Sequence, residues 1–226
     1  MIETVNLHKI YNQGRPNEFQ AVRDVSLKIE DYSFTLLAGP SGSGKTTLLS
    51  LCGCMTRPSS GRIFLREKEM TSLPERFLTD IRRRTFGFIF QSFNLIRGLS
   101  ALENVILPAY PTGERHDLLQ NRGTELLQRF GLGRHLTAKA EWLSGGQAQR
   151  VAIARALIMD PECIIADEPT AHLDTALSHE FMNLMEELHR DGRTILIASH
   201  DALVAEHRAL THRVALRDGQ VVTEAG

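Results

Sequence analysis

The segment from Gly39 to Thr46 follows the spacing G-x-x-x-x-G-K-[ST], which suits one kind of chemistry. Its residues are Gly39, Pro40, Ser41, Gly42, Ser43, Gly44, Lys45 and Thr46. Glycines let the backbone wrap closely with successive N–H groups pointing inward, and a following helix adds the positive end of its dipole. A chance Gly/Ser-rich turn rarely carries a Lys-Thr pair between a strand and a helix. The segment therefore predicts a site for the phosphates of a nucleotide.

Two side chains at the end of this segment define the ligand further. Lys45 carries a positive charge suited to β- and γ-phosphates, and the Thr46 hydroxyl is a hard oxygen ligand suited to Mg²⁺. We therefore expect ATP and Mg²⁺ to bind here, with the adjacent Thr47 also in contact with the nucleotide.

The apolar run that begins at Cys163 ends in two carboxylates, Asp167 and Glu168, and it predicts a buried strand at 163–167. Ligands of open α/β sheets bind at the carboxyl ends of strands, so Asp167 is expected to hold Mg²⁺ directly or through water. Glu168 can accept a proton from, or orient, the water that attacks the γ-phosphate. Two acids after a strand are also common in helix capping, so this pair alone would be a weak signal. The phosphate-binding segment at 39–46 favours the catalytic interpretation.

A second anion site is suggested by the run Leu143-Ser144-Gly145-Gly146-Gln147. Ser144 offers a hydroxyl, and the two glycines offer bare backbone N–H groups, at the start of a predicted helix. Alternatively, Ser144 only caps that helix and the glycines form a turn, and both interpretations can hold together.

This run resembles the signature motif of ATP-binding-cassette (ABC) ATPases, and residues 150–157, RVAIARAL, follow it as in that family. The resemblance covers essentially the whole chain and implies the ABC ATPase fold. It also implies a two-fold dimer in which the signature of one copy closes over the γ-phosphate held by the other copy. In that arrangement the nucleotide is contacted by Ser144, Gly145, Gly146 and Gln147.

Other positions of the family pattern are filled as well. Tyr11 matches the aromatic residue that stacks on adenine, and Gln91 matches a glutamine that reaches Mg²⁺ or water. His200 matches a histidine that hydrogen-bonds the γ-phosphate, and Asp174 lies in the nucleotide-contacting loop that crosses the dimer interface. The resemblance implies catalytic roles for Lys45, Gln91, Glu168 and His200, and metal ligation by Thr46, Gln91 and Asp167.

The elements that must position these residues alternate between strands and helices. Buried strands are predicted at 34–38, 86–90, 163–167 and 194–199. Alternating strands and helices imply a mostly parallel core sheet flanked by helices, which is an α/β fold. The helix after Asp174 is predicted to end near Gly192. Its core stripe is formed by Leu177, Phe181, Leu184, Met185 and Leu188.

Two further regions complete the predicted organisation of a single domain over 1–226. Residues 5–7 and 25–29 suggest antiparallel strands of an N-terminal β subdomain, joined by a polar loop. Helical stretches such as 118–130, separated by Pro and Gly, indicate an inserted helical subdomain at about 99–141. The β/α core then comprises about 1–98 and 142–226.

Composition limits the function classes. The 226 residues have a formal net charge of -1, so general attraction to nucleic acid is not expected, and Arg82-Arg83-Arg84 is interpreted as a solvated face. No stretch approaches the roughly 18 apolar residues of a spanning helix, and the first residues lack a secretory signal, which favours a cytosolic location. Cys52 and Cys54, predicted on one helix and pointing to different sides, are expected to be buried reduced thiols like the third cysteine.

Within the ABC family, the loop after Tyr11 and the stretches 82–91 and 103–108 look most similar to the lipoprotein-release and macrolide-export branch. That resemblance implies a homodimer, or a dimer with a paralogue, that drives an integral membrane permease from the cytoplasmic face of a bacterial inner membrane. A cell-division ABC ATPase that transports nothing would have the same motifs. A soluble ABC ATPase is a further alternative, but such proteins usually have two cassettes or a coiled-coil insertion, and this sequence shows neither. A module that binds ATP without hydrolysis would lack Glu168 or His200, and both residues are present.

Overall fold

The computed structural model describes residues 1–222, so the last four residues of the predicted domain lie outside the description. Its centre is a six-stranded sheet of order β10-β9-β3-β8-β7-β6. The strands are β3 (Phe34–Ala38), β6 (Phe86–Ile89), β7 (Cys163–Asp167), β8 (Thr194–Ser199), β9 (His212–Arg217) and β10 (Gln220–Val222). Neighbours pair in parallel except β9 with β10. The prediction of a mostly parallel sheet is confirmed.

The four strands predicted for this sheet agree closely with the structure. Three have the predicted bounds, while β6 ends one residue earlier, at Ile89. The strands β9 and β10 were not predicted, because their sequence lacks a continuous apolar run.

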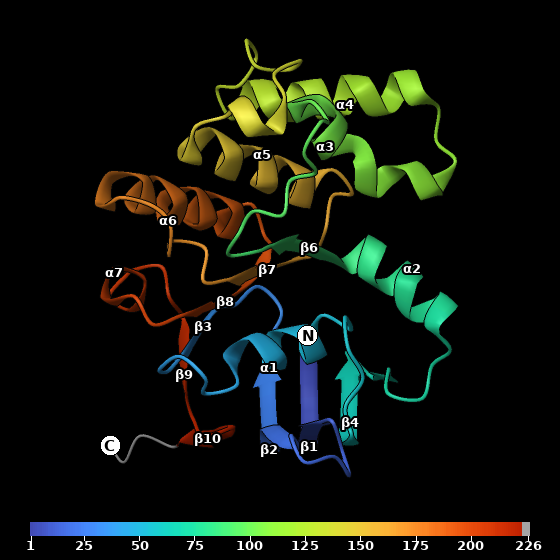
Figure 1. Ribbon diagram of the computed structural model, residues 1–226, viewed down its shortest axis with the longest axis vertical. Coiled ribbons are helices and arrows are strands. Elements are labelled where there is room, and N and C mark those ends of the chain that lie inside the picture. The colour runs from blue at the N-terminus through green and yellow to red at the C-terminus, as the bar shows by residue number, and fades with distance from the viewer. Residues whose placement is uncertain (223–226) are drawn as a thin grey trace.

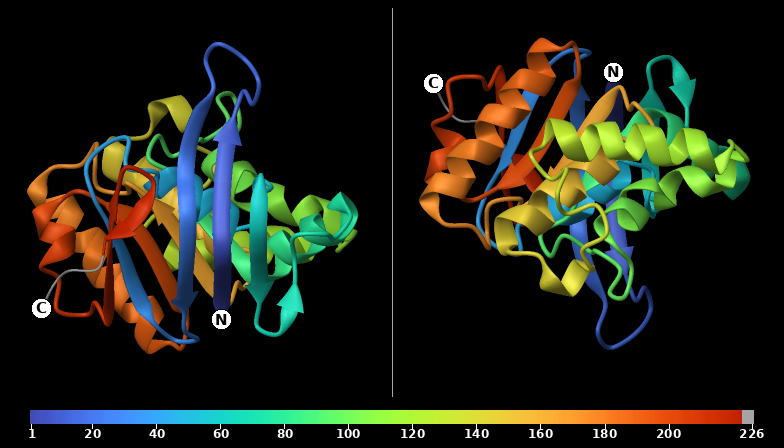
Figure 2. Two further views of the ribbon diagram at one scale, coloured as in Figure 1. Left: turned by 90° about the horizontal axis from the view of Figure 1, so that it is seen from below. Right: turned by 90° about the horizontal axis from the view of Figure 1, so that it is seen from above.

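An antiparallel sheet of order β2-β1-β4-β5 stands beside the central sheet. Its strands are β1 (Ile2–Tyr11), β2 (Phe19–Ile29), β4 (Ser60–Leu65) and β5 (Lys68–Glu69). Viewed from below, β1, β2 and β4 lie side by side (Figure 2). The predicted N-terminal antiparallel pair is confirmed, although its strands are longer than expected and β4 and β5 were not foreseen.

Alternate residues of the central strands face two separate cores. Ile164 and Ala166 of β7 point into a cluster shared with helices, whereas Cys163 and Ile165 point into a cluster shared with the antiparallel sheet. A strand with both faces buried must be apolar throughout, which explains the continuous hydrophobic run that made β7 recognisable from the sequence.

Helices cover both faces of the central sheet (Figure 1). They are α1 (Lys45–Cys52), α2 (Glu75–Thr85), α5 (Gly145–Leu157), α6 (Thr175–Arg190) and α7 (Ala202–Ala205). The helix α1 lies between the two sheets. On α6, Phe181, Met185 and Leu188 are buried as predicted, whereas Leu177 and Leu184 are partly exposed. No helix within residues 1–222 has both the length and the apolar character needed to cross a membrane.

Helices also gather at the end of the molecule opposite the antiparallel sheet (Figure 1). The segment 99–141 contains α3 (Ala101–Ile106), the 3-10 helix η1 (Leu107–Thr112), α4 (His116–Arg129) and the 3-10 helix η2 (Ala140–Trp142). Ser100 caps α3 with a reciprocal capping box to Glu103. The ends of the segment meet in an isolated antiparallel bridge between Ser100 and Lys139.

Two interpretations of surface and cysteine positions were wrong. Arg82 is not simply solvated, because its guanidinium donates to the Cys54 carbonyl at 2.7 Å and to Glu75 at 2.7 Å. Cys54 is not on the helix with Cys52, because α1 ends at Cys52 and Cys54 follows in a turn with φ of 56°. Both thiols are buried as predicted, and burial raises the pKa of Cys52 to about 12 and that of Cys54 to about 11.

Candidate functional site

The loop from Gly39 to Gly44 connects β3 to α1 at the carboxyl edge of the central sheet. Gly44 occupies the N-cap of α1 with φ of 99° and caps it without a side-chain hydrogen bond. The first backbone N–H groups of α1 are therefore available to an anion, whose negative charge the helix dipole also favours. A Cβ at Gly44 would overlap the carbonyl oxygen of Ala21, so both the space and the backbone angle require glycine here.

We predict that Gly44→Ala destabilises the fold by about 2–4 kcal/mol, through left-handed strain plus the overlap with Ala21. Gly14→Ala is the matched control, because Gly14 also has a positive φ of 75° but open space around its Cβ position. It is expected to cost only about 1 kcal/mol. Denaturant unfolding without nucleotide measures both, and equal losses would contradict the steric argument.

Lys45 is buried inside the loop that it follows. Its ammonium group donates to the carbonyl of Gly39 at 2.6 Å and to that of Pro40 at 3.1 Å. It also pairs with the Glu168 carboxylate at 3.2 Å. A buried positive charge beside the start of α1 is suited to phosphate oxygens, because the low local dielectric strengthens the attraction between them.

Thr46 and Asp167 meet across the gap between α1 and β7. The Thr46 hydroxyl donates to Oδ1 of Asp167 at 2.9 Å. Burial raises the pKa of Asp167 above the usual value of an aspartate, and the hydrogen bond from Thr46 opposes that rise. A hydroxyl and a carboxylate fit Mg²⁺, which takes hard oxygen ligands and completes its shell with water and phosphate oxygens. These two side chains would hold the ion.

Glu168 occupies a strained backbone position directly after β7. Its φ is 44°, and its N–H donates to the carbonyl of Ala198 on the neighbouring strand at 2.9 Å. A non-glycine residue in this region persists where its surroundings fix it, which is common at functional sites. Both Glu168 carboxylate oxygens lie 3.0 Å from Nδ1 of His200. The carboxylate thus lies between His200 and the Lys45 ammonium.

These side chains share one cavity of about 300 Å³. It is lined by Phe19, Ala21, Ser41, Gly42, Gly44, Lys45, Thr46, Thr47, Gln91, Glu168 and His200. The predicted phosphate, metal and catalytic side chains thus gather at one place, with Asp167 adjoining through Thr46. The Ser43 hydroxyl is buried and has no hydrogen-bond partner among the described residues, so a polar ligand in the loop would satisfy it.

The aromatic wall of this cavity differs from the sequence prediction. Tyr11 does not line the cavity. The centre of the Tyr11 ring lies 5.0 Å from the Lys9 ammonium. Phe19, which was not predicted, lines the cavity instead and is paired with Tyr11 across β1 and β2. Directly opposed residues of an antiparallel pair project to the same face, so this pairing places both rings on one side of the sheet.

The second predicted anion site lies outside that cavity. Ser144 caps α5 in a reciprocal box with Gln147, whose N–H donates to the Ser144 hydroxyl at 3.3 Å. The interpretation of Ser144 as a helix cap is therefore confirmed, and it is compatible with an anion site at the same helix end. A Cβ at Gly145 would meet open space, whereas a Cβ at Gly146 would overlap the Leu177 side chain of α6. None of these residues lines the cavity at Lys45.

Asp174 is likewise separate from the cavity in this chain. It caps α6, and its carboxylate accepts a hydrogen bond from the N–H of Leu177 at 2.9 Å. The buried Gln149 of α5 donates to the carbonyl of Pro169 at 2.9 Å. This bond ties the signature helix to the segment that leads from Glu168 to Asp174.

Comparison with known proteins identifies the group to which this arrangement belongs. A family model described as ABC transporter matches residues 22–171. The chain belongs to the ABC transporter family. This confirms the prediction made from the signature and the phosphate-binding loop.

Individual relatives agree with this assignment. The macrolide export ATP-binding/permease protein MacB of Hyphomonas neptunium is 43% identical over all of this chain, which spans 35% of that protein. An uncharacterized ABC transporter ATP-binding protein of Thermotoga maritima is 41% identical over 98% of this chain and 93% of its own length. This chain thus spans about a third of its MacB relative, and the resemblance to the macrolide-export branch is confirmed.

Solved structures confirm the predicted cassette fold. The dimeric structure of MJ0796, a bacterial ABC transporter cassette, matches with a TM-score of 0.90 at 39% identity, covering 99% of this chain and 97% of that one. A second structure of that cassette is a dimeric post-hydrolysis state bound to ADP and Pi, again with a TM-score of 0.90. The chain is therefore an ABC ATPase cassette, for which ATP and Mg²⁺ are the expected ligands.

Proposed function

We propose that this cassette hydrolyses ATP as a dimer and drives an integral membrane permease of the macrolide-export or lipoprotein-release type. One observation carries the proposal. Lys45, Thr46 and Glu168 line a single cavity. Ser144 caps α5, and neither Ser144 nor the glycines at the start of α5 line that cavity. A chain with two separate phosphate-binding halves completes a site by joining a second copy in two-fold symmetry.

The contacts around Lys45 support its role in the reaction. Its ammonium group can exchange the carbonyls of Gly39 and Pro40 for oxygens of the β- and γ-phosphates. Thr46 and Asp167 would hold Mg²⁺, whose positive charge would offset the negative charge of the phosphates. Gln91, at the cavity wall, is placed to reach the same region.

Glu168 and His200 act on the attacking water. The Glu168 carboxylate accepts a proton from the attacking water while the water oxygen bonds to the γ-phosphorus. The bond between the γ-phosphorus and the bridging oxygen of the β-phosphate breaks in the same step. His200 lies 3.0 Å from that carboxylate and also borders the cavity. We assign His200 to orienting Glu168 and to contacting the γ-phosphate.

The second copy contributes its Ser144, Gly145 and Gly146 to the γ-phosphate. The open space at Gly145 lets a partner backbone approach the start of α5 closely. We assign Asp174, through its cap on α6, to the loop that crosses this interface. Binding of two ATP molecules then holds the dimer closed, and hydrolysis releases it.

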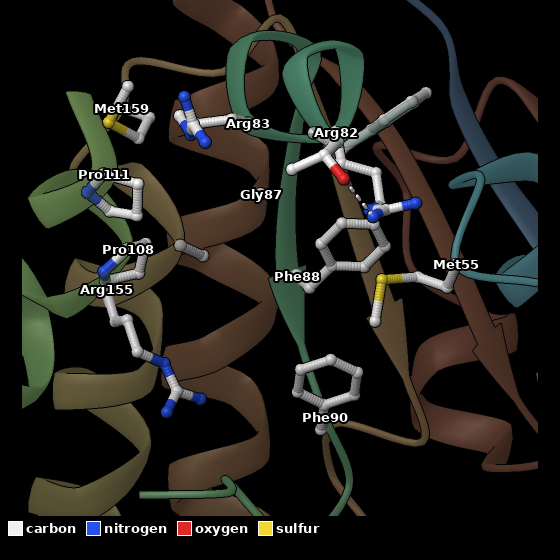
Figure 3. A pocket seen from close by; sticks show the side chains of 13 residues that line it. Met55, Arg82, Arg83, Gly87, Phe88, Phe90, Pro108, Pro111, Arg155 and Met159 are labelled. Atoms are coloured by element: carbon white, nitrogen blue, oxygen red, sulfur yellow. Dashed lines mark hydrogen bonds between the residues drawn. The ribbon is translucent and has the colours of Figure 1, made fainter. Parts of the chain in front are cut away.

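A groove between α2, β6 and the helical segment supports docking of the permease (Figure 3). It has a volume of about 360 Å³. One side of the groove is formed by Pro108, Pro111, Arg155 and Met159. The opposite side is formed by Met55, Arg82, Phe88 and Phe90. The mixture of aromatic rings, prolines and arginines suits an apolar helix or turn with an acidic end. We assign this groove to the cytoplasmic part of the membrane partner, which would place the cassette at the inner face of the membrane.

A chain of contacts joins this groove to the nucleotide cavity. The rings of Phe88 and Phe90 are stacked with centroids 6.0 Å apart. Both also line a smaller cavity that Thr46 and Asp167 share. We assign to these rings the coupling between a groove occupant and the Mg²⁺ ligands, because they line both cavities.

Co-purification tests this proposal. A tagged Glu168→Gln chain is expressed in its native cell, and membranes are solubilised with mild detergent and Mg-ATP. Recovery of a stoichiometric integral membrane protein would support a permease-driving role, and a transport assay with that protein would separate export from a cell-division role. Recovery of ribosomes or DNA-repair proteins without a membrane protein would contradict it.

The groove assignment makes a prediction of its own. Pro111→Arg adds charge and bulk at an exposed groove position and is expected to lower recovery of the membrane protein about tenfold or more. Leu118→Arg is the matched control, because Leu118 is also exposed but lies on α4 outside the groove. Equal recovery with both variants would place the docking site elsewhere. ATPase activity of the isolated chain checks that each variant is folded.

A further inference from the structure

Trp142 is the single tryptophan of the chain and is largely exposed, at 74%. It ends η2, two residues before the Ser144 cap of α5. Tryptophan has the largest apolar surface among the side chains, and an exposed tryptophan on a well-ordered element is typical of an interface anchor.

The backbone that presents Trp142 is firmly held. The N–H of Ala140 donates to the carbonyl of Leu99 at 3.0 Å. The Glu141 carboxylate accepts from the N–H of Gly98 at 3.0 Å. These bonds join η2 to the loop before α3, so the ring is displayed from a fixed support and little backbone entropy is lost when it is covered.

Trp142 lies close to the start of α5, so a protein surface that covers this helix end can reach the indole as well. Leu143 is extended, with φ of -80° and ψ of 141°, so the Cα atoms of Trp142 and Ser144 are about 7 Å apart. An indole side chain spans a similar distance. A phosphate group alone is too small to shield both, but a protein surface that carries the phosphate is large enough.

We propose that a second copy of this chain buries Trp142 against the rim of its own nucleotide cavity when the two copies close on ATP. This inference rests on the proposed ATP-dependent dimer. The facing surface has matching character, because the cavity of each copy is bordered by the apolar Phe19, which is 55% exposed. Trp142 thus extends the composite site beyond the signature residues and serves as an apolar anchor of the closed dimer.

Because the chain has one tryptophan, its emission reports on this residue alone. The Glu168→Gln chain is titrated across protein concentrations with Mg-ATP, while sedimentation measures the dimer. The inference predicts a blue shift and reduced acrylamide quenching that follow the dimer fraction. Dimers with unchanged emission would overturn the inference and leave the proposed function intact. A shift in the monomer would also overturn it, and no dimer at any concentration would refute both.

A second variant tests the energetic role of the ring. In the Glu168→Gln background, Trp142→Ala is expected to raise the dimer dissociation constant about tenfold or more, with Trp142→Phe intermediate. Tyr32→Ala is the control, because Tyr32 is similarly exposed, at 70%, and does not border the nucleotide cavity. Circular dichroism and ATP binding by the monomer should be unchanged in all three. A Trp142→Ala dimer as tight as the parent's would overturn the anchor role.

Discussion

A chain with Gln in place of Glu168 binds Mg-ATP but hydrolyses it about 10²- to 10⁴-fold more slowly than the parent. The amide has nearly the shape of the carboxylate, so the position after β7 and the contact with the Ala198 carbonyl are retained. It cannot accept the proton of the attacking water, however. ATP therefore stays intact, and the closed dimer accumulates.

Phosphate release under saturating Mg-ATP measures this loss. Glu180→Gln is the matched control, because Glu180 is an exposed carboxylate on α6 and does not border the cavity. It should leave the rate unchanged. A Glu168→Gln chain as active as the parent would show that another group handles the proton, and the catalytic assignment of Glu168 would be wrong.

Lys45→Ala is expected to weaken ATP binding about 10²-fold and to abolish measurable hydrolysis. The substitution removes the buried ammonium group that contacts Gly39, Pro40 and Glu168. Glu168 then loses its only ion-pair partner besides His200 among residues 1–222. Its negative charge is left close to the site of the phosphates, which adds repulsion to the lost attraction.

Calorimetric titration with ATP and Mg²⁺ measures this change. Lys68→Ala, at an exposed position on β5, controls for loss of a lysine elsewhere. If the Lys45→Ala chain bound ATP as tightly as the control, the cavity at Lys45 would not be the nucleotide site. Binding of ADP by the same variants shows whether the loss depends on the γ-phosphate.

The central strands and the phosphate-binding loop could be predicted because their constraints are local. A strand buried on both faces must be apolar throughout, as β7 is, and a loop that wraps phosphate needs glycines at fixed positions such as Gly44. In these two cases sequence spacing determines the spatial relation. Glu168 and His200 were assigned to one site by their match to the ABC family pattern, and the structure shows that they follow the neighbouring parallel strands β7 and β8.

Other features depend on pairings between distant segments, which spacing does not fix. Phe19 lines the cavity, and its place on the sheet is set by the register of β1 and β2, which contains several shifts. Arg82 looked like part of a solvated run, but the turn at Cys54 folds back to accept its hydrogen bond. The strand β9 was missed because only half of its residues are apolar, and pairing with its parallel neighbour β3 holds it in place.

The central claim is that one copy's phosphate-binding loop and another copy's signature form a single site. Mixing two inactive variants tests it most directly. Lys45→Ala disables the phosphate-binding loop but keeps the signature, whereas Ser144→Arg blocks the signature but keeps the loop. Each variant alone should hydrolyse no ATP, and their mixture should regain hydrolysis because a hybrid dimer contains one intact composite site. A mixture as inactive as its components, with hybrid dimers shown by sedimentation, would contradict the account.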